Sequence, residues 1–140
     1  MKTFFTALIA LLVLAACTKK NGSSEVPVDD GKPKGVVIAS ATIAQGTIIG
    51  DQANGEAMIY NDNGKLQLFI SKFSSNNGPD LRVYLSTDQS ASNFINLGKL
   101  KSVSGDQLYD IPGNPNLAVH KFVVIWCAQY AVYFGGGQWK

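Results

Sequence analysis

Residues 56–70 have the sequence EAMIYNDNGKLQLFI, and this stretch decides the fold. Asn63 and Gly64 form the dipeptide that is most typical of a two-residue β-hairpin turn. After the turn, residues 65–70 alternate polar and apolar side chains before the run becomes wholly apolar, as in a strand with one buried face. The stretch therefore predicts an antiparallel hairpin near the middle of the chain.

Short β-rich runs continue on both sides of this hairpin, with turn residues between them. None of them keeps a helical period, and strong helix formers are few, since Glu25 and Glu56 are the only glutamates. Strands at roughly ten-residue spacing, separated by Gly and Asn, are typical of antiparallel sandwiches and barrels. We therefore expect a single all-β domain, an antiparallel β-sandwich or a barrel-like fold. The expected strands lie in residues 36–49, 56–60, 65–70, 81–85, 96–98, 107–111, 119–127 and 129–134.

Length and charge restrict the functions that are open to this chain. Its 140 residues allow one domain with a tail, and a hydrophobic content of 46% can supply a core. The net charge is only +2 and Arg82 is the only arginine, whereas a protein that binds nucleic acid needs a basic stripe. We therefore expect no nucleic acid among the partners.

The first part of the chain has the pattern of an export signal. Lys2 precedes an apolar run of 11 residues, 4–14, which is too short for a bilayer span of about 20 residues. The run ends in LAAC at 14–17, which is similar to the lipobox of bacterial lipoproteins, where the Cys thiol receives a diacylglyceryl group. We expect residues 1–16 to be a lipoprotein signal peptide and Cys17 to be lipidated. The alternative is an ordinary secretory signal with a Cys near its cut site.

A lipid anchor also implies a location and a linker. Thr18 follows Cys17 where an Asp would resemble an inner-membrane retention signal, so the outer membrane or the cell surface is favoured. Residues 18–35 are mostly Lys, Asp, Gly, Ser and Pro, which cannot form a core. We expect residues 17–35 to be the lipidated Cys and a flexible tether that spans about 20–25 Å as a coil. The folded domain is then residues 36–140.

The most apolar run of the mature chain is FVVIWC, residues 122–127. Both faces of such a strand must be covered, so we expect it to be central in the sheet. His120, the only histidine, lies near its start, and Cys127 lies at its end without a disulfide partner if Cys17 is lipidated. A pair of Cys127 and His120 is disfavoured, because their odd separation along one strand places the two side chains on opposite faces.

Several other kinds of site lack support in the sequence. A phosphate-binding Gly loop and a Cys-x-x-Cys-His haem attachment are missing, and one histidine is too few for most zinc sites. Four aspartates, at 80, 88, 106 and 110, all lie at turns, where Asp caps and bends the chain. We therefore assign no catalytic carboxylate pair and no metal site, with Cys127 as the one candidate for a metal ligand.

An ordered set of short motifs resembles a known domain. The blocks are GEA at 55–57, residues 66–73, GPDLRVYL at 78–85, LGKLK at 97–101, Gly105, YDIP at 109–112 and VIWC at 124–127. In this order they resemble the DM-thirteen domain, the Skeletor-type electron-transfer family, over residues 40–135 or so. The resemblance implies a β-sandwich-like fold whose signature cysteine, here Cys127, acts in redox chemistry, as a thiol or by holding a cofactor such as haem or a metal. The ending GGGQWK departs from the usual pattern and leaves the edge of the last strand open.

Three functions are compatible with these residues. The first is a lipid-anchored electron-transfer module in which Cys127 serves a redox partner protein, Trp126, Tyr109 and Asp80 line a pocket beside it, and Arg82 is a candidate activating cation. Each of these residues also has a structural interpretation, as a buried hydrophobe, a core aromatic residue or a turn cap. The second function is a non-catalytic module that binds a ligand or partner at the cell surface. The third, a thiol enzyme, has the least support, because no general base is visible beside Cys127.

Overall fold

The computed structural model describes residues 22–46 and 52–140, and every regular element in these two ranges is a β-strand. This confirms the prediction of an all-β domain. Each run of residues that the sequence predicts to be a strand overlaps with an observed strand. The strands are β1 (Val28–Asp29), β2 (Val36–Gln45), β3 (Ala53–Asp62), β4 (Lys65–Ser75), β5 (Leu81–Ser86), β6 (Phe94–Lys99), β7 (Ser104–Asp110), β8 (Phe122–Cys127) and β9 (Val132–Gln138).

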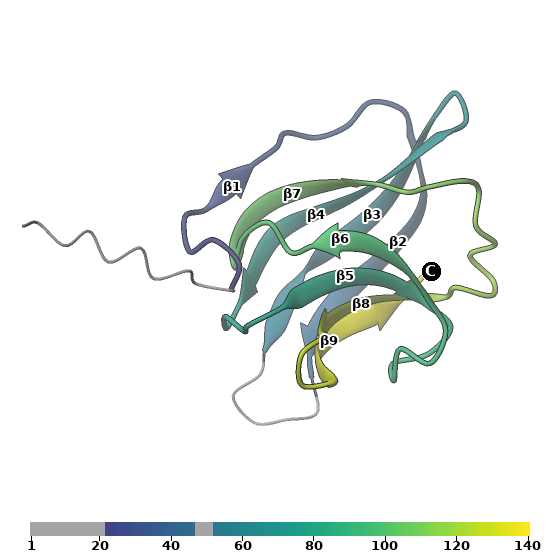
Figure 1. Ribbon diagram of the computed structural model, residues 1–140. Helices are drawn as coiled ribbons and strands as arrows, with labels where there is room; N and C mark the ends of the chain where they lie inside the picture. Colours follow the sequence, from purple (N-terminus) through teal and green to yellow (C-terminus); the bar gives the residue numbers. More distant parts are fainter. Residues whose placement is uncertain (1–21, 47–51) are drawn as a thin grey trace, which may run out of the picture.

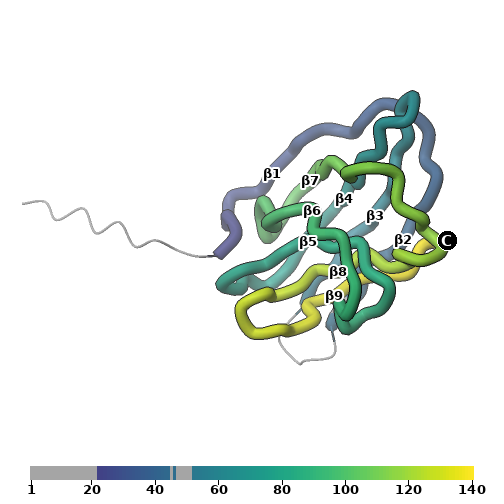
Figure 2. The backbone as a smooth tube through the Cα atoms, turned by 45° about the vertical axis from the view of Figure 1, so that its right-hand side comes forward, coloured from purple at the N-terminus to yellow at the C-terminus, as the bar shows by residue number. Residues whose placement is uncertain are grey.

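The nine strands form one sheet that curls into a half-barrel (Figure 1). Their order in the sheet is β1-β7-β4-β3-β2-β9-β8-β5-β6, and every pair is antiparallel except β1 with β7. The curl brings β6, at one edge of the sheet, back into contact with β7 near the other edge (Figure 2). The concave side of the sheet therefore encloses the core.

The hairpin of β3 and β4 forms where the sequence predicts it. Asn63 and Gly64 have φ angles of 52° and 91°, the left-handed backbone that a tight two-residue hairpin turn requires. Asn61 Oδ1 accepts a hydrogen bond from Gly64 N at 2.8 Å, which closes the turn. Asp62 and Lys65 are then the first pair of the ladder.

The strand β8 is central, as its apolar sequence indicates, because it lies between β5 and β9. Val123, Ile125 and Cys127 belong to the core inside the curl, and each is at most 1% exposed. Val124 faces the other side of the sheet and is also buried, with 0% exposure. Both faces of this strand are covered, which explains why it has almost no polar side chain.

The glycine run near the C-terminus continues the last strand and does not end it. A Cβ atom added to Gly137 would lie 2.2 Å from the carbonyl oxygen of Thr42 in β2, and one added to Gly136 would lie 2.2 Å from that of Val123 in β8. Only glycine allows the backbones to approach so closely. The run therefore makes β9 the junction between the two halves of the sheet.

The described part of the segment that we expected as a free tether, residues 22–35, contacts the domain. Val28 and Asp29 pair in parallel with Gly105 and Asp106 of β7. From β1 the chain then crosses to the start of β2, over the end of the sheet that carries the β3–β4 hairpin (Figure 1). These contacts depend on backbone groups and short polar side chains. The expectation of a tether was based on the lack of apolar residues, which says nothing about contacts of this kind.

Within the described ranges, no helix has the length and apolar character that crossing a membrane requires.

Candidate functional site

Cys127 is a free thiol at the last position of β8, and its side chain points into the core. It lies opposite Leu81 of β5 on one side and Val132 of β9 on the other. Its residue exposure is 1%, so water and reagents do not reach the sulfur in this conformation. Reactive cysteines need partial exposure and a nearby cation, and Cys127 has the environment of a small buried hydrophobe.

Trp126 and Arg82 lie opposite one another on neighbouring strands, and alternation places both on the outer face of the sheet. Arg82 Nε donates a hydrogen bond to Asp80 Oδ1 at 2.7 Å, within an ion pair whose side chains are only about a quarter exposed. The structure thus brings three of the expected pocket residues together, but on the face away from the sulfur of Cys127. Trp126 and Arg82 line no pocket beside the thiol, and Asp80 lines only a small hollow whose walls do not include Cys127.

Tyr109, the fourth expected pocket residue, faces the core from β7 in a separate polar network. Its hydroxyl donates to Gln107 Oε1 at 2.7 Å and accepts a hydrogen bond from Lys101 N at 3.0 Å. Gln107 Nε2 in turn donates to the carbonyl oxygen of Ser102 at 2.8 Å. Burial raises the pKa of Tyr109, so the phenol stays neutral at physiological pH. This network ties β7 to the loop that follows β6, which is a structural role.

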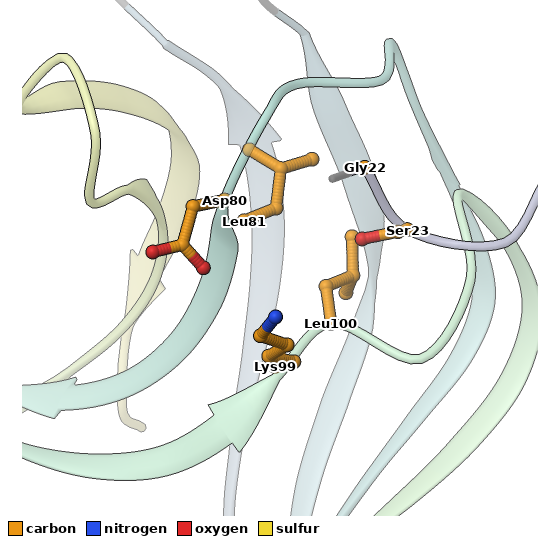
Figure 3. Close-up of a pocket in the computed structure, with 6 residues that line it drawn as sticks. All are labelled: Gly22, Ser23, Asp80, Leu81, Lys99 and Leu100. Carbon is orange, nitrogen blue, oxygen red and sulfur yellow. The ribbon is translucent and has the colours of Figure 1, made fainter. Parts of the chain in front are cut away.

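A small hollow lies at the end of the half-barrel where β5 begins (Figure 3). Its volume is about 20 Å³, room for about one water molecule. Leu81, which pairs with Cys127, is one of its walls, so the hollow and the thiol belong to the same end of the domain. Its lining residues are Gly22, Ser23, Asp80, Leu81, Lys99 and Leu100.

The described residues do not fit haem or a metal at Cys127. Cofactor pockets usually measure about 300–1,000 Å³, and the hollow at this end of the fold is far smaller. In the parts of the chain that the structure describes, no three His, Cys, Asp or Glu side chains are grouped as metal ligands. His120 precedes β8, outside the core cluster that holds Cys127. We therefore derive no chemistry from a cofactor held by this thiol.

A short turn of residues 128–131 follows β8 directly after Cys127. The four residues 128–131 are all exposed, and Ala128 N donates to the carbonyl oxygen of Asp80 at 2.8 Å. Ala131 has a φ of 53°, a left-handed conformation that costs a residue with a Cβ atom about 1 kcal/mol. The strand that carries the thiol thus ends in an exposed turn with one strained residue, and such a turn opens at a lower free energy than the whole domain unfolds.

Aromatic residues that the sequence analysis did not single out lie on the outer face near Trp126. The rings of Tyr84 and Phe94 are stacked, with centroids 4.0 Å apart. Tyr133 lies opposite Trp126, and its hydroxyl accepts a hydrogen bond from Gln89 Nε2 at 3.5 Å. Burial raises the pKa of Tyr84 and of Tyr133. Both phenols are therefore neutral, and the loop that carries Gln89 covers part of this face.

Comparison with protein families matches residues 49–137 to Electron transfer DM13. The chain belongs to the DM13 family. The match covers the strands from β3 to β9 and includes Cys127, so it confirms the resemblance that the sequence motifs indicate. Membership associates this DM13 domain with electron transfer. Comparison with curated proteins and with solved structures gives no match.

Proposed function

We propose that this DM13 domain takes part in electron transfer outside the cytoplasm, that acyl chains on Cys17 anchor it to a membrane, and that the thiol of Cys127 is its redox group. One observation carries the proposal. Cys127 is a free, buried thiol at the last position of β8, directly before an exposed turn in which Ala131 is left-handed. A thiol protected in this way is available only when the turn opens.

The proposed chemistry is thiol–disulfide exchange with a redox partner protein. When turn 128–131 opens, Cys127 loses its proton to water, and the thiolate attacks one sulfur of a disulfide on the partner. A mixed disulfide forms as the partner's S–S bond breaks, and the second partner sulfur leaves as a thiolate that takes up a proton. In this step the sulfur of Cys127 is oxidised from a thiol to one half of a disulfide, and the leaving partner sulfur is reduced to a thiol. A dithiol on a second protein then reduces the mixed disulfide, which restores Cys127 and releases the partner with two thiols. Over the whole cycle two electrons pass from the second protein to the partner through Cys127.

The anchor is supported by the LAAC sequence at 14–17 after an uncharged apolar run. Several acyl chains hold a protein at a membrane far more firmly than one, because each buried methylene contributes about 0.8 kcal/mol. Acylation of Cys17 also leaves Cys127 as the only thiol of the mature chain, so the redox reaction needs a partner.

The test is the rate at which a thiol reagent labels the native, acylated protein in the absence of denaturant. We expect Cys127 to be labelled completely but slowly, through local opening. Ala131→Gly relieves the left-handed strain and stabilises the closed turn, so labelling slows about three- to tenfold. Ala91→Gly is the matched control, because Ala91 also has a left-handed φ, of 52°, but lies in the loop after β5. We expect this substitution to leave the labelling rate unchanged. Labelling that follows only global unfolding contradicts the redox role.

A second candidate function is the binding of a partner protein without redox chemistry. Val36, Val37 and Ile38 are consecutive apolar residues at the start of β2 that are 67%, 48% and 45% exposed. Adjacent exposed apolar side chains favour a protein contact at this end of β2. If binding is the function, the thiol reagent labels Cys127 only when the whole domain unfolds. Val37→Lys then reduces the yield of the cross-linked complex with the partner in intact cells.

A further inference from the structure

The folded part of this chain begins only a few residues after the proposed anchor. Asn77 holds the first described residues with two hydrogen bonds, because its Oδ1 accepts from Ser23 N at 3.1 Å and its Nδ2 donates to Ser23 O at 3.0 Å. Ser102 Oγ then lies 3.0 Å from the carbonyl oxygen of Ser24 and 2.7 Å from that of Val26, and its one hydroxyl proton serves these two acceptors. The chain is therefore attached to the domain from Ser23 onward.

The distance that remains for a tether is short. Cys17 and Gly22 are five residues apart in the sequence. Even a fully extended chain spans at most about 3.6 Å per residue, so the reach from one to the other is at most about 18 Å. The domain is longer than that, since the 11 residues of β4 alone extend over about 33 Å. A tether shorter than the domain restricts which end can approach the membrane.

We propose that one end of the half-barrel rests on the lipid headgroups, an inference that depends on the proposed acylation of Cys17. This membrane-facing end consists of the segment 22–26, the turn 76–80 and the turn 128–131. The three lie together, because Asn77 binds Ser23 and the carbonyl oxygen of Asp80 accepts from Ala128 N at 2.8 Å. Figure 1 shows the start of β1, the start of β5 and the turn between β8 and β9 at this same end.

The exposed side chains of this end suit a headgroup surface. Tyr130, in the turn 128–131, is 66% exposed, and Val26 is 71% exposed. Tyrosine is enriched at membrane–water interfaces, because its ring is apolar and its hydroxyl is polar. Lys19 and Lys20 lie between Cys17 and the first described residue, and each basic residue near anionic lipids contributes about 1 kcal/mol. The short tether and the exposed aromatic residue therefore favour the same orientation, and the basic residues add to the attraction between the tether and the lipid surface.

This orientation places the turn that directly follows Cys127 next to the membrane, because turn 128–131 belongs to the membrane-facing end. A redox partner then reaches the thiol along the membrane surface and not from bulk solvent. The hairpin turn at Asn63 and Gly64, at the other end of β4, points away from the lipid.

Fluorescence quenching in vesicles tests the orientation. Full-length protein with Tyr130→Cys or with Lys65→Cys is acylated, labelled with a fluorescent maleimide and reconstituted into vesicles of phosphatidylethanolamine and phosphatidylglycerol. A fraction of the lipids carries a nitroxide on the headgroup, which quenches only nearby dyes. Lys65 is the matched position, because it is exposed and lies at the opposite end of β4. Wild-type protein is treated in the same way, and its fluorescence gives the amount of dye that attaches to Cys127.

We expect quenching at least fivefold stronger at position 130 than at position 65. A Gly/Ser insertion of 20 residues after Asn21 lengthens the tether to about 25 Å as a coil, and the quenching at position 130 then falls toward that at position 65. Equal quenching at the two positions, or no change on lengthening the tether, overturns the orientation. Mass spectrometry and vesicle flotation of the same samples test the anchor separately. An unacylated Cys17 overturns the anchor, whereas acylated, vesicle-bound protein with equal quenching overturns only the orientation.

Discussion

Asp30 and Lys101 are 71 residues apart in the sequence and form an ion pair in which Nζ lies 2.5 Å from Oδ2. The same carboxylate oxygen accepts a hydrogen bond from Leu108 N at 2.9 Å. The hydrogen bond from Lys101 is the main cause that lowers the pKa of Asp30 below its usual 3.8, with a further contribution from Leu108, although partial burial acts in the other direction. One carboxylate thus fastens the N-terminal segment to β7.

Replacement of this carboxylate is expected to destabilise the domain in a pH-dependent way. A carboxyl group whose pKa is lowered on folding stabilises the protein above its unfolded pKa, and this contribution is lost as the pH falls through the folded pKa. Asp30→Asn should therefore lower the free energy of unfolding by about 1 kcal/mol at pH 7 and by much less near pH 3. Urea unfolding at the two pH values measures the difference.

Asp29→Asn is the control for this experiment, because it removes the same charge from the neighbouring residue. The carboxylate of Asp29 accepts only a long hydrogen bond from Gly31 N, at 3.3 Å, and its pairing with β7 uses the backbone. We expect its stability to stay within about 0.5 kcal/mol of wild type at both pH values. Equal losses in the two variants would contradict the role of the ion pair.

Gly137→Ala is expected to destabilise the junction between β9 and β2. The new methyl group would lie 2.2 Å from the carbonyl oxygen of Thr42, so one of the two strands must move. Forced overpacking of this kind costs about 1–3 kcal/mol. Chemical denaturation measures the loss, and Gln138→Ala, an exposed change at the next position, should cost less than about 0.5 kcal/mol. A Gly137→Ala variant as stable as this control would show that the strands can separate without penalty.

The strands were predictable from the sequence because their signals are local. Alternation in β4, the Asn63-Gly64 turn and the wholly apolar β8 each depend on neighbouring residues only. β1 was not predictable, since it is two residues long and is held by backbone pairing with Gly105 and Asp106, which are distant in the sequence. No apolar pattern marks such a strand.

The candidate site was predictable only as far as strand alternation applies. Alternation separates Cys127 from Trp126, but because β8 is apolar on both faces it does not indicate which of the two side chains faces the core. It does not show that Tyr109 lies in a network with Gln107 instead of beside Cys127, because that placement depends on the curl of the whole sheet. The same alternation along β5 could have grouped Tyr84 with Arg82 on the outer face. The contact of Tyr84 with Phe94 depends on the register of the next strand.

Tyr109→Phe is expected to weaken the polar network that ties β7 to the loop after β6. The change removes the donor to Gln107 Oε1 and the acceptor for Lys101 N, which costs about 1–2 kcal/mol in a buried site. Tyr130→Phe removes a hydroxyl at a position that is 66% exposed and should leave the melting temperature unchanged. Similar melting temperatures for the two variants would contradict a structural role of the buried network.

Wild type and Tyr109→Phe are expected to differ in how their stability changes at alkaline pH. Burial raises the pKa of Tyr109 above its usual 10.0, so its neutral form stabilises the fold below pH 10 and this contribution is lost as the pH rises further. Wild type should therefore lose more stability above pH 10 than Tyr109→Phe does. Thermal unfolding of both proteins between pH 8 and pH 11 measures the difference, and parallel curves would argue against burial of the phenol.

Replacements of Cys127 distinguish burial from reactivity at the proposed redox thiol. Cys127→Ala removes one sulfur from a packed core and should lower the free energy of unfolding by about 1 kcal/mol. Cys127→Ser keeps the size of the side chain but buries a hydroxyl among Leu81 and Val132, so it should cost more, about 2–3 kcal/mol. Urea unfolding of the two variants gives the order. If Ser is tolerated as well as Ala, water already reaches this position in the native state, and the turn 128–131 does not protect the thiol in the way that the proposed function requires.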